Sequence, residues 1–125
     1  MKSNHGIIPA LLLVVALCTA EGVLAQAWPA KPVRIISTIP LGGSGDVAMR
    51  MAAAKMAESM GQPVLVETNG ASGGVVGART VQKAPPDGYL LLHSSSGALA
   101  SSVYLSKDLG YDPRTDFAPI SLVSY

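Results

Sequence analysis

Short apolar runs, glycine-rich turns and amphipathic segments follow one another in a repeating order along this chain. The first apolar run, Val33–Ile39, leads into glycines and then into a segment from about Asp46 to Met60 whose apolar positions recur at helical spacing. Gly61 is the residue type expected just beyond a helix C-terminus. The pattern predicts a strand, a glycine-rich turn and a helix. Because apolar residues cover much of the helix circumference, we expect the helix to be heavily buried.

The same order recurs twice more. Val64–Glu67 predicts a second strand, and a second helix is expected from about Val75 to Lys83. Tyr89–His93 predicts a third strand, buried on both faces because its apolar residues are continuous. Strand, helix and strand at this spacing form a βαβ unit with parallel strands. The fold class is therefore α/β, a three-layer arrangement built from parallel βαβ units.

Three loops rich in Gly and Ser follow the three predicted strands. In an open parallel sheet the ligand crevice lies outside the carboxyl ends of the strands, so we expect these loops to converge at one edge. None of them contains Lys or Arg, and their hydrogen-bond donors are backbone N–H groups and hydroxyls. These features predict a site that binds an anion through neutral donors. The loops are Gly42–Asp46, Ala71–Gly74 and Ser94–Gly97.

The first loop also opens the first helix, whose N-terminus adds unpaired N–H groups and the positive end of the helix dipole. Glycines let the backbone approach a ligand closely, and Ser44 adds a hydroxyl. Asp46 stands where either a helix N-cap or a carboxylate facing a ligand would stand. The alternative to an anion site is an ordinary strand-to-helix turn in which Asp46 is the N-cap.

The N-terminal residues have a different pattern. Lys2 supplies a positive charge, residues 6–20 are almost unbroken apolar, and Ala25-Gln26-Ala27 fits the small-x-small site of signal peptidase. A membrane anchor is the alternative, but the run is shorter than the roughly 20 residues that span a bilayer. We therefore expect residues 1–27 to be a cleaved secretory signal peptide.

Charge and composition exclude several kinds of site. Nine Lys and Arg against eight Asp and Glu give a net charge of +1, and the charges are scattered singly, so no basic face for nucleic acid is expected. Beyond residue 27 there is no cysteine and His93 is the sole histidine, which is too few ligands for a zinc site. We expect His93 to pack or to hydrogen-bond, and we expect no metal and no cofactor.

One alternative function is a Rossmann-like dinucleotide-binding domain of an oxidoreductase. Gly43-x-Gly45-x-x-Ala48 follows a strand, and Glu67 lies near the end of the next strand, as the dinucleotide fingerprint requires. An export signal argues against this function, because a soluble nicotinamide cofactor is rarely available outside the cytoplasm.

A second enzyme pattern is a hydrolase nucleophile elbow. Gly70-x-Ser72-x-Gly74 lies between a strand and a helix, as that motif does. The acid and the histidine that must follow are restricted to Asp87 and His93, which lie too close together in the chain to reach Ser72 as an ordered triad. We therefore expect the chain not to be an enzyme.

Five segments carry motifs in a fixed order. They are Trp28-Pro29-x-Lys31-Pro32-Val33-Arg34-Ile35, Gly42-Gly43-Ser44-x-Asp46, Gly61-Gln62-Pro63-Val64-x-Val66-Glu67, Lys83-Ala84-Pro85-Pro86-Asp87-Gly88-Tyr89 and Tyr111-Asp112-Pro113-x-x-Asp116-Phe117-x-Pro119-Ile120. Together they resemble the periplasmic solute-binding receptors of tripartite tricarboxylate transporters, the Bug proteins. The last two motifs are the most specific, because no general rule of turns or helices would produce both.

The resemblance implies a two-lobed periplasmic receptor that captures a small carboxylate for membrane subunits of a transporter. Residues 28–118 would form the first part of lobe one, a partial periplasmic-binding-protein-like lobe, and residues 119–125 would start the crossover towards a second lobe. Main-chain N–H groups, hydroxyls and ordered water would hold the carboxylate. By position, the residues that would meet the ligand are Gly42, Gly43, Ser44, Asp46, Ser72, Gly73, Ser95, Ser96 and Gly97.

The chain also departs from the family pattern. Leu41 stands where a proline is usual, Asn69-Gly70 replaces Arg-Pro, and Ser94 and Ser96 replace Gly and Asn, which leaves the identity of the carboxylate open. Family members are much longer, so we expect a fragment or a truncated gene product that ends in an apolar strand, Ile120–Ser124. Such a chain is expected to bind carboxylates no tighter than about millimolar and to associate through exposed strand edges.

Overall fold

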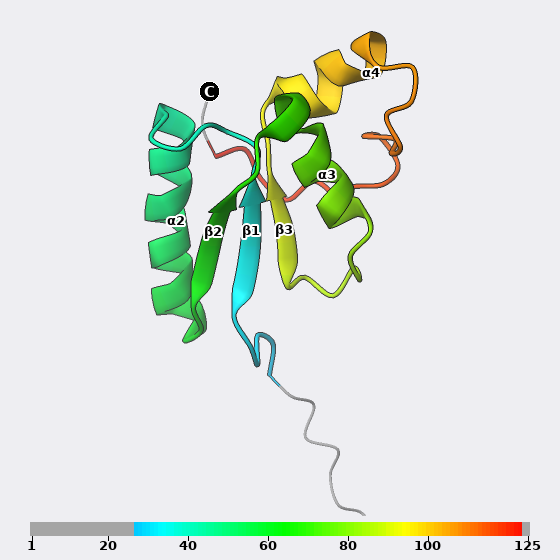
Figure 1. Ribbon diagram of the computed structural model, residues 1–125. Coiled ribbons are helices and arrows are strands. Elements are labelled where there is room, and N and C mark those ends of the chain that lie inside the picture. Colours follow the sequence, from blue (N-terminus) through cyan, green and yellow to red (C-terminus); the bar gives the residue numbers. More distant parts are fainter. Residues whose placement is uncertain (1–26, 124–125) are drawn as a thin grey trace, which may run out of the picture.

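A computed structural model describes residues 27–123 (Figure 1). The expected signal peptide therefore lies outside the described residues, apart from Ala27. Within the described range, three parallel strands form one sheet in the order β2-β1-β3. The elements are β1 (Val33–Ser37), α2 (Ser44–Met60), β2 (Val64–Thr68), the 3-10 turn η1 (Ala71–Gly74), α3 (Val75–Gln82), β3 (Leu90–His93), the π-helical turn η2 (Gly97–Ser101) and α4 (Ser102–Leu105).

The expected α/β class with parallel strands is confirmed, and so are the three strands and the two longer helices. The central strand β1 pairs with β2 from Val33 opposite Val64, and with β3 from Arg34 opposite Leu90. Gly61 ends α2 in the left-handed region at φ 65°, and its N–H donates to the carbonyl of Ala57. The periodicity of the sequence therefore located these elements to within two residues.

Helix α2 covers one face of the sheet. Met49 and Ala53, one turn apart, are buried against Ile35 of β1. Half-buried apolar residues surround this core: Ala52, Met56, Val64, Val66 and Leu91. The apolar face of α2 therefore packs against alternate residues of the strands, and this contact stabilises the helix on the sheet.

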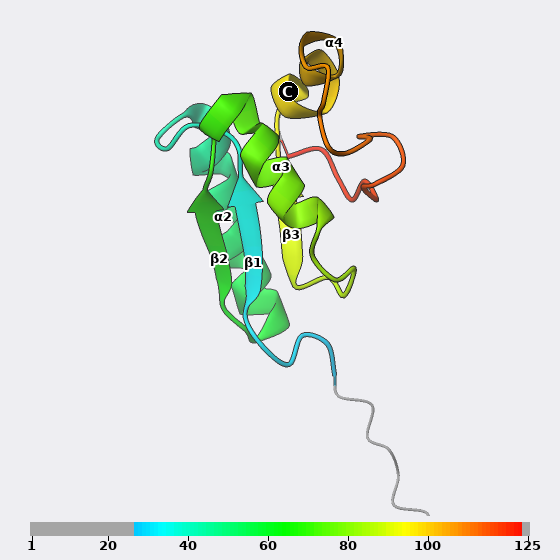
Figure 2. The ribbon, with the colours of Figure 1, turned by 45° about the vertical axis from the view of Figure 1, so that its right-hand side comes forward.

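Helix α3 covers the opposite face, so the described part has three layers; Figure 2 shows α2 behind the sheet and α3 in front of it. The helix lies close to the sheet at Gly77, where a Cβ would come within 2.7 Å of the carbonyl oxygen of Asn69 and 3.2 Å of Ile36 Cγ2. Only glycine permits this approach without a shift of the backbone.

The expectation that α2 is heavily buried is wrong. Val47 is 49% exposed and Met51 is 68% exposed, and only Asp46, Met49 and Ala53 are buried. The reason is that α2 packs on the sheet from one side only, so apolar residues on its outer side meet no partner within residues 27–123.

Two expectations about the strands are also wrong. The three leucines of β3 are half-buried and not buried on both faces, because β3 is an edge strand of the described sheet. The segment that begins at Ile120 is not a strand in residues up to 123; Ile120 is 79% exposed and Leu122 67% exposed. A strand needs a neighbour to hydrogen-bond, and this segment has none in the described part.

The helical segment η2 and α4 was not predicted, because its serines and alanines give no clear period. The chain beyond α4 is tied back to the fold. Arg79 of α3 donates to the carbonyls of Leu109 at 2.6 Å and Asp108 at 2.8 Å. Tyr111 donates to the carbonyl of Ala98 at 2.6 Å.

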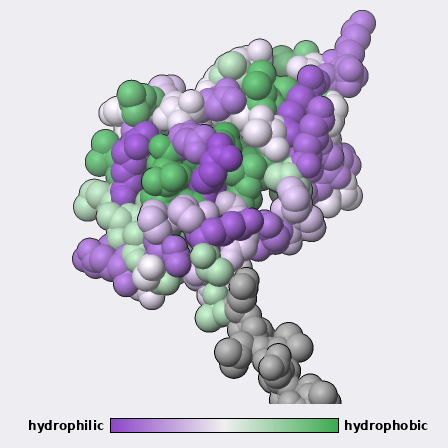
Figure 3. All heavy atoms as spheres, turned by 60° about the horizontal axis from the view of Figure 1, so that its bottom comes forward, coloured by the Kyte–Doolittle hydropathy of each residue, from purple (hydrophilic) through white to green (hydrophobic). Residues whose placement is uncertain are grey.

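Seen obliquely from the amino ends of the strands, the surface has apolar side chains at its centre among hydrophilic ones (Figure 3).

Candidate functional site

All three predicted loops lie at the carboxyl ends of the strands, at one edge of the sheet (Figure 1). The convergence expected from a parallel sheet is therefore confirmed. Eight of the nine residues predicted to meet a ligand are exposed or half-buried at this edge, and Asp46 alone is buried. The eight are Gly42, Gly43, Ser44, Ser72, Gly73, Ser95, Ser96 and Gly97.

The second and third loops meet around Thr38, which follows β1. The Thr38 hydroxyl donates to Ser94 Oγ at 2.9 Å, and its N–H donates to the carbonyl of His93 at 2.9 Å. On the other side, the N–H of Asn69 donates to the carbonyl of Ser37 at 2.7 Å. The sequence analysis missed Thr38, although its place directly after the central strand was a usable signal.

Contact between these two loops depends on a glycine. Gly74 has φ 94°, and a Cβ there would lie 2.7 Å from Thr38 Cβ and 3.1 Å from Ala98 Cβ. No side chain fits at that distance. Ser72, two residues earlier, also has a positive φ, 53°, which is rare for a residue other than glycine. Ser72, Gly73 and Gly74 therefore follow one another in the left-handed region.

The first loop is held by a carboxylate. The N–H of Gly42 donates to Asp46 Oδ2 at 3.0 Å, and Arg50 Nε donates to the same oxygen at 3.0 Å. Gly43 is the N-cap of α2, so Asp46 lies in the first turn and is not itself the cap. The N–H of Gly43 donates to the carbonyl of Pro40 at 3.1 Å. The backbone donors of the first turn that remain for a ligand are therefore the N–H groups of Ser44, Gly45 and Asp46, which have no carbonyl one turn earlier in the helix.

Asp46 is 2% exposed, and its Oδ1 has no hydrogen-bond partner among the described residues. The hydrogen bond from Arg50, together with that from the Gly42 N–H, holds the pKa of this carboxyl below its usual range, against the effect of burial. The group is therefore ionised at neutral pH, and Arg50 balances its charge. The sequence analysis missed Arg50, which stands four residues after Asp46 on the same helix face.

His93 is buried and its Nδ1 lies 3.1 Å from Ser37 Oγ. Burial lowers the pKa of the imidazole, and the charge of Asp46 partly opposes that effect. Asp87, the other residue that a hydrolase triad would need, lies 3.7 Å from Lys31 Nζ and accepts the N–H of Tyr89. His93 was expected to pack or to hydrogen-bond, and the structure shows both. Neither His93 nor Asp87 contacts Ser72 by a hydrogen bond in the described residues.

Glu67 is held in a two-pronged ion pair with Arg34, at 2.6 and 2.7 Å. The hydrogen bonds raise the pKa of Arg34 and lower the pKa of Glu67. The carboxylate that a dinucleotide ribose would require is therefore already bound to a neighbouring strand.

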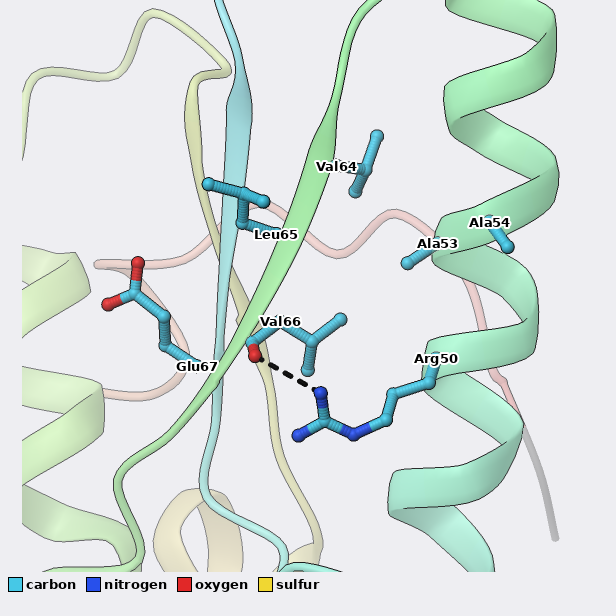
Figure 4. Close-up of a pocket in the computed structure, with 7 residues that line it drawn as sticks. All are labelled: Arg50, Ala53, Ala54, Val64, Leu65, Val66 and Glu67. Carbon is cyan, nitrogen blue, oxygen red and sulfur yellow. Dashed lines mark hydrogen bonds between the residues drawn. The ribbon is translucent and has the colours of Figure 1, made fainter.

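A hollow of about 540 Å³ lies between α2 and β2, on the flank of the sheet and away from the loop edge (Figure 4). Val64 and Val66 point into it, whereas Leu65 and Glu67 point to the other side of β2. Arg50 reaches across its end to the carbonyl of Val66, at 3.4 Å. The hollow is largely apolar, and Arg50 and Glu67 are the charged residues among those that line it.

Within residues 27–123, no three His, Cys, Asp or Glu side chains come together as metal ligands would. In the same range no helix has the length and apolar character to cross a bilayer.

Residues 48–125 match the model of a family described as the tripartite tricarboxylate transporter family receptor. The chain is 41% identical to Protein BugT of Bordetella pertussis, over 83% of this chain and 32% of that protein. A UPF0065 protein of Bordetella bronchiseptica is 34% identical, over 97% of this chain and 38% of its own length. The chain thus spans about a third of the length of these curated relatives.

Solved structures agree with these matches. MatC from Rhodopseudomonas palustris, solved with bound malate, superposes with a TM-score of 0.71 at 33% identity, over 77% of this chain and 33% of that one. A second R. palustris protein, solved with adipate, gives a TM-score of 0.66 at 31% identity, over 70% and 29% of the two chains.

Proposed function

The chain belongs to the tripartite tricarboxylate transporter family of receptors, and on that premise we propose that its three loops bind a small carboxylate for uptake into the cell. The observation that carries the proposal is the shared edge: three loops of small residues bring serine hydroxyls and the first turn of α2 together, and the loops contain no Lys or Arg. Similar proteins were solved with malate and with adipate, which supports a dicarboxylate as the ligand class.

A carboxylate at this edge accepts hydrogen bonds from neutral donors. Each such charge-assisted bond contributes about 1.5–3 kcal/mol, and the N-terminus of α2 adds up to about 1 kcal/mol. Affinity from donors of this kind is modest and release is easy, as delivery to a transporter requires. The ligand is bound and released without chemical change.

We further propose that residues 1–27 direct export and are removed, so that the chain acts in the periplasm and passes its ligand to membrane subunits. N-terminal sequencing of exported protein is expected to start at Trp28. A product that retains Met1 would contradict this part of the proposal.

Titration calorimetry with malate tests the site. Ser44→Ala removes a hydroxyl at the N-terminus of α2, and we expect the affinity to fall about tenfold. Lys55→Ala is the matched control on the same helix, because Lys55 is exposed and, within residues 27–123, pairs with Glu58 alone, at 2.8 Å. Equal effects of the two substitutions would mean that the site is misplaced.

The dinucleotide alternative gains no comparable support, because Glu67 is bound to Arg34. Mixing the chain with NADH and following cofactor fluorescence is expected to give no change.

A further inference from the structure

A continuous set of hydrogen bonds joins the first loop to the end of β2. Asp46 Oδ2 accepts the N–H of Gly42 and the Nε–H of Arg50, both at 3.0 Å. The two Nη groups of Arg50 then donate to the carbonyl of Val66 and to Oγ1 of Thr68, both at 3.4 Å. Thr68 is the last residue of β2, and only Asn69 and Gly70 separate it from the second loop. The set therefore runs from one predicted ligand loop to the root of the next.

We propose that Asp46 and Arg50 are positioning residues, which fix the spacing between the first and second ligand loops and do not themselves touch the ligand. This inference rests on the proposed function, since it assigns a role within that same site. The burial of Asp46 favours it, because a carboxylate 2% exposed offers no surface to a solute. An anionic ligand would also be repelled by a carboxylate at close range, whereas Asp46 is balanced by Arg50.

Arginine is suited to this position because its planar fork can face three acceptors at once. The Nε–H of Arg50 donates to the Asp46 carboxylate on α2, and the two Nη groups donate to acceptors on β2. A lysine has a single compact ammonium and cannot reach both sides with the same geometry. Arg50→Lys therefore separates the two halves of the set: the bond to Asp46 is retained and the contacts to β2 are lost.

The exposed pair of Lys55 and Glu58 supplies the control. It lies on the same helix at 2.8 Å, with side chains 79% and 67% exposed, and bonds to neither loop. Replacing Lys55 by methionine thus perturbs charge on α2 without touching the proposed link.

The amide resonances of Gly42 and Asn69 report on the two loops in the purified chain without ligand. Arg50→Met is expected to shift both. Asp46, which accepts the N–H of Gly42, loses its hydrogen bond from Arg50, and Thr68, next to Asn69, loses its contact with Arg50. Arg50→Lys is expected to shift Asn69 and to leave Gly42 nearly in place. Lys55→Met is expected to shift neither, and the amide of Leu91 in β3 serves as the check on folding. If Arg50→Met does not fold, the Arg50→Lys pattern decides.

Titration with malate then gives the functional consequence. Arg50→Met is expected to weaken binding about tenfold. Unshifted Gly42 and Asn69 amides in the arginine variants, or equal shifts in Lys55→Met, would overturn the inference whatever the affinity. If instead the two amides shift as expected but malate perturbs no loop in the original chain, the coupling stands and the proposed function fails.

Discussion

The first loop and the pair formed by the second and third loops lie at the same edge but are held by different forces. A buried ionised carboxylate and an arginine brace the first loop. Close contact around Thr38, at a glycine with no room for a side chain, joins the other two. The geometry of the first loop therefore depends on the charges of Asp46 and Arg50, and that of the second and third loops depends on the space around Gly74. The two dependences respond to different perturbations and can be measured separately.

The largest expected effect falls on the space-dependent loops. Gly74→Ala adds a methyl 2.7 Å from Thr38 Cβ at a residue with φ 94°. Backbone strain and overpacking together should lower the free energy of unfolding by about 2–6 kcal/mol in urea denaturation. Gly61→Ala is the matched control, because it has φ 65° with nothing within 4 Å and carries the strain alone, about 1–2 kcal/mol. Equal losses at the two positions would show that space around Thr38 is not limiting.

A smaller effect is expected at the charge-dependent loop, and it should vary with pH. The pKa of Asp46 is lowered in the folded chain, so its contribution to stability is present above the ordinary value of 3.8 and is lost as the pH falls through the folded pKa. Asp46→Asn should destabilise the chain at pH 7 and less at pH 3, which lies below the ordinary pKa of 3.8, by urea midpoints. Gly74→Ala should cost the same at both pH values. An Asp46→Asn effect that does not change with pH would contradict the charge assignment.

His93, at the root of the third loop, should give a weaker effect in another pH window. Burial lowers its pKa, and Asp46, whose charge raises it, is the charged group that faces it. As the pH falls below about 6.5, His93 therefore binds a proton in the unfolded chain before it does so in the folded chain. The free energy of unfolding declines from that pH downwards. His93→Asn should flatten that limb of the stability profile while leaving the limb near pH 3. An unchanged limb would show that His93 does not titrate on unfolding.

The smallest effect is expected from the ion pair of Arg34 and Glu67, which belongs to neither loop system. Both side chains are about half exposed, and exposed pairs contribute little. Glu67→Gln should shift the urea midpoint less than Asp46→Asn does at pH 7. The small shift between Glu67→Gln and the unsubstituted chain should vanish in 1 M salt, where the Debye length is about 3 Å. A larger shift than that of Asp46→Asn would contradict the ranking.

The sequence predicted the parts of the fold that follow from periodicity and turn chemistry. Apolar spacing and Gly61 located α2, and the order of strands and helices predicted a parallel sheet. Burial was predicted poorly, because the exposure of Met51 and of the leucines in β3 depends on which neighbours pack beside them.

At the candidate site the loops were predictable and their supports were not. Gly and Ser after each strand indicated the loops, whereas the contacts of Thr38 and of Arg50 bring together residues distant in sequence. Thr38 could have been singled out by its place directly after β1, but no local pattern distinguishes an arginine such as Arg50 from one that faces solvent. Asp46 was recognised as important at the helix start, but only its hydrogen bonds reveal that it faces inward.

The most direct test of the account is a titration of the purified chain with malate, followed through its backbone amides. We expect the largest shifts in Gly42–Asp46, Ala71–Gly74 and Ser94–Gly97, and we expect them to saturate together in a range that extends to about 100 mM for millimolar binding. Shifts concentrated at Ala53, Ala54 and Val64 in the hollow beside α2, or no shift at the loops, would contradict the claim that the carboxyl edge of the sheet is the carboxylate site.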